Sequence, residues 1–350
     1  MSAAGDPVES VGARRRPRRR RARILLALVV LLALSQAPFA YRRYQLGRLR
    51  ARIAEANSRR APAPLDDDFG DHAGVFHVHS SLGGHTTGRP EEIVSAARAN
   101  GLAFVVMTEH PASHVNTAEA TLKGEHEGVV FINGSELVAR GGERLFVAPG
   151  FDRQPPEAES VSLQQLINLA ATENRLALVA YPGQVRDWRL DGYDGLEVYN
   201  LYTDARDASF ARLFFDGLWS YWSYPELLFV TFYDRPAANL SKWDELNAAG
   251  ARRSAVAGND AHANVGLSLG GREGESLFSF RLDPYERSFR IVRNHVLLPK
   301  GERPTAENVL AALRRGRSYM AFDLFCDSSG FRFAAEAGAA RASMGEEVTL

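Results

Sequence analysis

Four apolar segments that lie far apart in this chain each run directly into histidine or carboxylate side chains. The polar ends of these segments are His77-Val78-His79, Thr108-Glu109-His110, Gly134-Ser135-Glu136 and Asp260-Ala261-His262. Residues two apart in a β-strand point to the same face, so the first and last of these motifs each direct two metal-binding side chains one way. Because parallel α/β folds gather residues at the C-terminal ends of their strands, one site is expected to collect all four motifs.

Helical and strand patterns alternate along the middle of the chain. Strands are predicted at 74–79, 102–108, 129–133, 144–148, 176–181 and 195–199, and helices at 90–100, 118–127 and 162–174. Such alternation predicts parallel strands with crossover helices. The aromatic-rich segment Phe210–Tyr233 is predicted to be wall of the same domain, with substrate stacking as the alternative.

Histidine together with carboxylate is a ligand set that suits zinc, manganese or iron. The single cysteine, Cys326, excludes a cysteine-based metal cluster and an internal disulfide. We expect Cys326 to be a small buried hydrophobic side chain. The metal-binding candidates are therefore imidazoles and carboxylates.

The N-terminal region has the layout of a membrane anchor. Eight arginines between Arg14 and Arg23 precede the apolar run Ile24–Leu34, which continues less purely to Tyr41. By the positive-inside rule, the arginine cluster stays in the cytoplasm and the body is exported, although arginines from Arg42 onward weaken that orientation. An uncleaved signal anchor is favoured over a cleaved signal sequence because Pro38 would follow the cleavage position.

The remaining boundaries follow from composition. We expect a basic cytoplasmic tail at 1–23, a transmembrane anchor at 24–41, a stalk and linker at 42–69, a folded α/β domain at 70–325 and the start of a β-rich segment at 326–350. The body after residue 60 is net acidic, which argues against nucleic-acid binding. We therefore expect a single-pass membrane protein whose folded domain lies outside the cytoplasm.

Over residues 72–325 the chain resembles the polymerase and histidinol phosphatase (PHP) superfamily. The matching motifs are HVHS at 77–80, TEH at 108–110, GSE at 134–136, EVYN at 197–200 and NDAH at 259–262. From LRRGRSYMAF onward it looks like the membrane-associated or exported branch of the carbaryl-hydrolase type. The resemblance implies a distorted (β/α)7 barrel. It also implies one metal site of His77, His79, Glu136 and Asp260, and another of His85, His110 and His262.

The family's usual second metal site is altered in this chain. Where the family has two histidines, this sequence has Arg144 and Tyr181. Neither residue is a usual zinc or manganese ligand, so the resemblance implies two divalent ions with the second site weakened. Arg144 is expected to act in place of the missing ion as a fixed positive charge on phosphate.

The leading functional hypothesis is a metal-dependent phosphoesterase acting on a small phosphorylated substrate, with Asp260, Glu136 and Arg144 as catalytic residues. An amide, carbamate or ester hydrolase acting on an acyl substrate at the same centre is the first alternative. A non-catalytic membrane-tethered binding protein on a decayed barrel is the second.

Glu109 is expected either to steady His110 or a neighbour, or to be an exposed loop carboxylate. Asn200 is expected to contact substrate or to cap a turn. Surface or structural positions are expected for His72, His114, His126 and His295.

Overall fold

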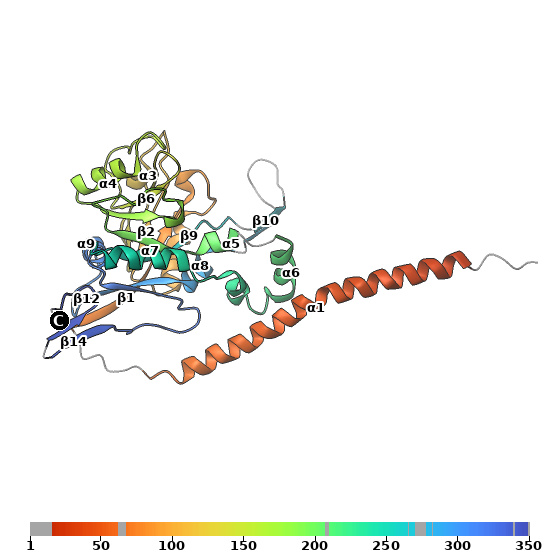
Figure 1. Ribbon diagram of the computed structural model, residues 1–350. Coiled ribbons are helices and arrows are strands. Elements are labelled where there is room, and N and C mark those ends of the chain that lie inside the picture. The colour runs from red at the N-terminus through yellow and green to blue at the C-terminus, as the bar shows by residue number, and fades with distance from the viewer. Residues whose placement is uncertain are drawn as a thin grey trace, which may run out of the picture. The chain divides into compact units, whose positions relative to one another are not determined.

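Figure 1 shows the computed structural model of the chain, which describes residues 16–61, 68–206, 210–264, 266–269, 278–281, 283–338 and 340–348. The chain divides into two compact units. One comprises residues 1–51 and 209–228, and the other comprises residues 52–208 and 229–350.

The first unit is built on the long helix α1 (Arg16–Ser58), whose last residues belong to the second unit, and on α6 (Phe210–Ser220). The large apolar side chains between Ile24 and Leu34 are all exposed. Among the described residues, this is the one helix long and apolar enough to cross a membrane, and a signal sequence would have the same character. The prediction of an N-terminal apolar helix is confirmed, and its topology stays a prediction.

The second unit contains a large, mostly parallel sheet. Its strands are β1 (Phe69–Val78), β2 (Phe104–Met107), β3 (Gly124–His126), β4 (Val129–Ile132), β5 (Ser135–Val138), β6 (Arg144–Ala148), β7 (Leu176–Ala180), β8 (Gly195–Asn200), β9 (Ser254–Ala261), β12 (Arg293–Pro299) and β13 (Ser318–Ala321). They are ordered β3-β4-β2-β1-β9-β8-β7-β6-β5, with β12 pairing β1 and β13. Two separate hairpins are formed by β10 (Gly266–Leu269) with β11 (Phe278–Arg281) and by β14 (Ala334–Ala337) with β15 (Ala340–Ser343).

Helices surround this sheet (Figure 1). They are α2 (Pro90–Ala99), α3 (Thr117–Ala120), α4 (Leu163–Thr172), α5 (Leu201–Arg206), α7 (Ala237–Ala248), α8 (Tyr285–Ile291) and α9 (Ala306–Arg314). The amphipathic helices α2 and α4 begin where the sequence predicts. Together with α9, each buries one apolar face against the strands. The broad prediction of an α/β fold is confirmed. The strand order is open, and no closed barrel is detected among the described strands.

One predicted strand direction and one predicted helix are wrong, and a turn containing glycine lies at each of these places. Strand β6 runs antiparallel to β5 and β7, since Gly141 and Gly142 adopt positive φ and reverse the chain after β5. The predicted helix at 118–127 is only the short α3, because Glu127-Gly128 forms a turn with positive φ at both residues and makes β3 and β4 a hairpin.

Two further predictions fail outside the sheet. Most of the aromatic-rich segment Phe210–Tyr233 belongs to the first unit and adds no strand to the described sheet, so it is not wall of the predicted domain. Cys326 is exposed rather than buried. It lies in the turn after β13, where Ser328 donates hydrogen bonds to Asp323 from both its backbone nitrogen and its hydroxyl, and this turn holds Cys326 at the surface.

Candidate metal centre

Four buried side chains from three strands converge at one point of the second unit. His77 Nε2 lies 3.1 Å from Glu136 Oε2 and 3.3 Å from Asp260 Oδ1. His79 Nε2 lies 3.3 Å from the same oxygen of Glu136 and 3.4 Å from the same oxygen of Asp260. Two imidazole nitrogens and two carboxylate oxygens thus face a common centre, and this cluster could bind a metal ion.

Irregular backbone brings these side chains together. His77 and Asp260 both have positive φ, at 68° and 47°, and the pairing of β1 with β9 shifts register between Phe76 and Val78. Gly258 lies opposite Phe76, and a Cβ at this glycine would come within 1.8 Å of Glu197 Oε1 and 3.0 Å of His77 Nδ1. The bulge and the glycine together make room for the cluster.

A second group adjoins the first. His79, His85 and His262 offer ring nitrogens within 4.8 Å of one another. His110 lies beside them, with its ring 4.4 Å from that of His85 and 4.9 Å from that of His79. The structure therefore brings together all seven predicted metal ligands. It groups His79 with both sets, whereas the sequence places His79 in the first set alone.

The donor set fits a divalent metal ion. His79 is fully buried, yet neither of its ring nitrogens has a hydrogen-bond partner among the described residues. A buried polar atom without a partner is costly, and metal coordination would satisfy one of these nitrogens. The mixture of imidazole and carboxylate agrees with zinc, manganese or iron and leaves the identity and number of ions open.

Charge and burial act in opposite directions within the cluster. Burial alone would lower the pKa of His77, but Asp260, Glu197 and Glu136 around it hold that pKa well above its ordinary value. Burial would raise the pKa of Glu136, but His77 and His79 hold it well below its usual range. At the rim of the cluster, burial lowers the pKa of His110 to about 3 and that of His262 to about 4. Both rim imidazoles are therefore neutral near pH 7, which is the form that binds metal.

Glu197 is a site residue that the motif analysis missed. It comes from β8, is fully buried, and places Oε1 2.6 Å from His77 Nδ1. A carboxylate on the remote nitrogen of a metal-binding histidine fixes its tautomer and orientation, so that the other nitrogen faces the ion. The sequence signal was present in the EVYN motif, but periodicity alone could not show that this glutamate faces His77.

Arg144 and Tyr181 reach the cluster from β6 and from the end of β7. Arg144 Nη1 donates to Glu136 Oε1 over 2.5 Å, and its guanidinium lies 5.2 Å from the centre of the Tyr181 ring. The Tyr181 hydroxyl donates to Asp260 Oδ2 over 2.6 Å. These two positions therefore hold a cation and a phenol, each bonded to one carboxylate of the cluster.

Glu109 and Asn200, the two residues with alternative predicted roles, both form hydrogen bonds near the cluster. Glu109 is buried, so it is not an exposed loop carboxylate. It accepts hydrogen bonds from the Ser80 backbone nitrogen at 3.1 Å and from the Thr121 hydroxyl at 2.8 Å. This fixes the chain just after His79. Asn200 Oδ1 accepts from the Thr203 backbone nitrogen at 2.8 Å, which makes it the cap of α5, while its amide group contacts the cluster.

The four other histidines lie away from the cluster. His114 is exposed, while His72 and His126 are partly exposed. His295 is buried between two carboxylates, with Nδ1 2.8 Å from Asp71 Oδ1 and Nε2 3.1 Å from Asp323 Oδ2. None of the four joins either ligand group of the described residues.

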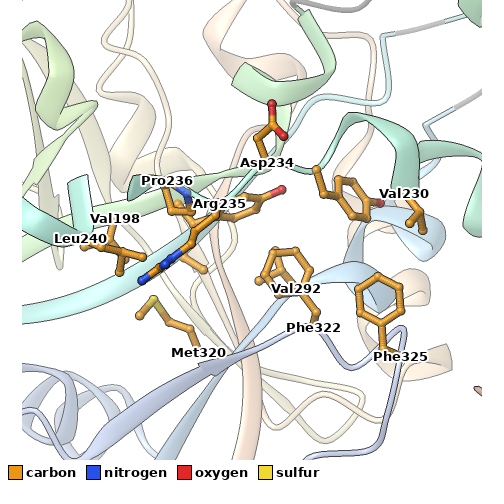
Figure 2. Close-up of a pocket in the computed structure, with 13 residues that line it drawn as sticks. Val198, Val230, Asp234, Arg235, Pro236, Leu240, Val292, Met320, Phe322 and Phe325 are labelled. Atoms are coloured by element: carbon orange, nitrogen blue, oxygen red, sulfur yellow. The ribbon is translucent and has the colours of Figure 1, made fainter. Parts of the chain in front are cut away.

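A separate cavity of about 450 Å³ lies in the second unit. Figure 2 shows Val198, Leu240, Val292 and Phe322 around it, with Arg235 extending among these apolar side chains. Its lining contains none of the seven predicted ligands. The cavity is therefore distinct from the metal-ligand cluster.

No protein-family model matches this chain, and no curated protein matches it. Among solved structures, it is similar to the crystal structure of PsfC from Pseudomonas syringae PB-5123, with 16% sequence identity over 72% of this chain and 92% of that chain and a TM-score of 0.44. A likeness of this degree assigns the chain neither a fold family nor an activity.

Proposed function

We propose that this chain is a metal-dependent hydrolase that cleaves phosphate esters. The observation that carries the proposal is the convergence of His77, His79, Glu136 and Asp260, all buried, on one centre from separate strands. Burying two carboxylates and two imidazoles together is expensive unless an ion or a reaction needs them there. The PHP-like motifs place the same residues in the same role.

The residues of the site fall into proposed metal ligands and a residue that orients one of them. His77, His79, Glu136 and Asp260 would hold one divalent ion, and His85, His110 and His262 would hold another. Such ions supply a water of lowered pKa and positive charge for the phosphoryl oxygens. Glu197 keeps His77 Nδ1 protonated and turns Nε2 toward the ligand cluster.

Arg144 favours an anionic substrate over a neutral one. Its side chain is 32% exposed and remains at the cluster through its bond to Glu136, so it offers a fixed positive charge that is accessible to solvent. A planar guanidinium binds phosphate oxygens well, whereas a carbamate or amide offers no such anion. This supports phosphoester hydrolysis over the acyl alternative.

The decisive experiment measures metal content and turnover on the same preparations. We expect the full chain in detergent to purify with a divalent metal and to release phosphate from aryl phosphates faster than it cleaves aryl carbamates. His77→Ala and His262→Ala should each lose metal and turnover. The matched control is His114→Ala, which replaces an exposed histidine outside both groups.

Each contrary outcome selects another hypothesis. Faster carbamate cleavage would favour the acyl hydrolase. A protein that purifies without metal and stays inert when metals are added would favour the binding protein. Arg144→Ala that keeps both turnover and substrate affinity would refute the role given to that arginine.

The finer fold prediction belongs to the same proposal. Strand β4 is followed almost at once by β5, and an isolated parallel bridge joins Glu109, just beyond β2, to Ser135. The Glu136 backbone nitrogen also donates to the Glu109 carbonyl over 3.1 Å. We infer that β4 and β5 act as one bent strand that closes the sheet between β2 and β6 into a seven-stranded barrel of the PHP type.

The domain layout also remains a proposal. The apolar run within α1 supports a membrane anchor at 24–41, and the linker and hydrolase domain would follow at 42–69 and 70–325. The arginine cluster before the run supports a body outside the cytoplasm. Accessibility of the body to an externally added protease in intact cells tests this orientation.

A further inference from the structure

Helix α6 carries a one-sided apolar stripe. Phe214, Leu218 and Trp222 are 49%, 65% and 84% exposed, and they follow one another at intervals of four residues. Side chains at this spacing lie on one face of a helix, and the turn after α6 continues it as far as Tyr224 through the bond from the Tyr224 backbone nitrogen to the Ser220 carbonyl. Three large apolar side chains in a row are unusual on a surface that meets only water.

The opposite face of α6 forms hydrogen bonds with α1 within the same unit. Asp216, which is 3% exposed, accepts a hydrogen bond from Arg42 at 2.5 Å. Arg43 donates to the Trp219 carbonyl and, over 2.7 Å, to the Ser223 hydroxyl. These bonds orient α6 with Asp216 toward α1 and with the apolar stripe on the opposite side.

These contacts begin where the apolar run of α1 ends. The Trp219 indole donates to Gln36 Oε1 over 3.2 Å, and the rings of Phe39 and Phe215 lie 5.0 Å apart. Gln36 follows Leu34, the last residue of the exposed apolar run, by two positions. Further contacts reach Arg50, which donates to the Ser223 carbonyl over 3.4 Å. The stripe on α6 therefore lies beside the part of α1 that directly follows the exposed apolar run.

We propose that α6 is a second membrane-contacting element, which lies in the lipid interface beside the anchor and inserts Phe214, Leu218 and Trp222. Tryptophan and phenylalanine are favoured at this depth, and an amphipathic helix there buries its apolar face while its polar face stays bound to protein. The proposal rests on α1 entering a membrane and is independent of the hydrolase proposal.

The same contacts account for two of the arginines that follow the apolar run. Arg42 and Arg43 are engaged by Asp216, the Trp219 carbonyl and Ser223. They thus join α6 to the anchor and do not act as free charges at the membrane. A soluble partner protein could also cover an apolar stripe, but continuity with the exposed apolar run of α1 favours lipid.

The test uses the full chain in phosphatidylcholine vesicles and one fluorescent label at a time. The native cysteine is removed by Cys326→Ser, and a bimane label is attached after Leu218→Cys or, separately, Trp222→Cys. The matched control is Phe333→Cys, because Phe333 is 69% exposed and lies outside the α1 and α6 unit. Both labelled positions are exposed, so the substitutions replace side chains at the surface.

We expect brominated acyl chains to quench both α6 labels and aqueous iodide to quench them far less than the label at position 333. That control label should respond to iodide and ignore the brominated lipid. Iodide quenching at positions 218 and 222 equal to that at 333 would overturn the proposal. Protection from both quenchers would overturn it as well, because it indicates burial against protein.

Discussion

The buried pair of contacts around His295 gives a quantitative prediction about stability. Its ring lies between Asp71 and Asp323 and stacks on Tyr319 with ring centres 4.5 Å apart. Burial would lower the pKa of His295, but hydrogen bonds to the two carboxylates raise it to about 9. The imidazolium therefore joins β12 to the start of β1 and to the segment after β13.

The size of the effect follows from the shift in pKa. Raising the pKa from 6.5 to about 9 stabilises the folded state by roughly 3 kcal/mol when the ring is charged. Because the folded pKa is above the unfolded one, this contribution is complete below about pH 6.5 and is lost as pH rises through about 9. Asp71 and Asp323 act at the other end: burial would raise each pKa, but bonds to His295 lower it, so their contribution is lost only as pH falls through those lowered values.

The assay compares the wild-type chain with His295→Gln in detergent, using urea unfolding followed by tryptophan fluorescence at several pH values. The difference in free energy of unfolding should shrink by roughly 3 kcal/mol between about pH 6.5 and pH 9 or just above. Groups at the metal-ligand cluster titrate in both proteins and cancel in the difference. A difference that stays constant across this range would refute the charged pairing of His295.

Three further predictions concern the candidate site and the surface. Glu197→Gln should lower metal affinity by about 10- to 100-fold, measured by calorimetric titration, because the carboxylate that orients His77 is lost; unchanged affinity would contradict that role. Gly258→Ala should lower both metal content and melting temperature, since its Cβ would lie 1.8 Å from Glu197 Oε1. Cys326 should react fully with a maleimide in the native chain, detected as a mass shift, and a native protein that reacts only after unfolding would show the residue to be buried.

The sequence predicts the strands of this chain better than their directions. Apolar runs such as those ending at Met107 and Ile132 form buried strands near the expected positions, because their side chains have no other stable environment. Direction is set by turns that contain few residues. The Gly141-Gly142 turn reverses β6, and no pattern within the strand itself records this reversal.

The aromatic segment shows the limit of composition as evidence. Aromatic residues suit a domain core, a ligand pocket and a membrane interface equally well, so their number alone cannot choose among these. What decides in α6 is the pairing of Asp216 with Arg42, which are separated by 174 positions. A contact of this range between two charged residues is invisible to any reading of local periodicity.

The sequence predicts that His77 and His79 lie together at the end of β1 because a regular strand would place them on one face. The structure brings them together by a bulge instead. In a regular strand, His77 would share a face with Val75, and Val78 would share one with Phe76. Instead Val75 and Val78 pack in the same apolar cluster, while the His77 ring lies 4.5 Å from Phe146, in the cluster that contains Phe76. A bulge at His77 thus rotates it to the side of the ligand cluster. A residue other than glycine costs about 1–3 kcal/mol in the left-handed conformation. His77 adopts this conformation at the point where its ring meets Glu136 and Asp260, so the strain coincides with the ligand cluster.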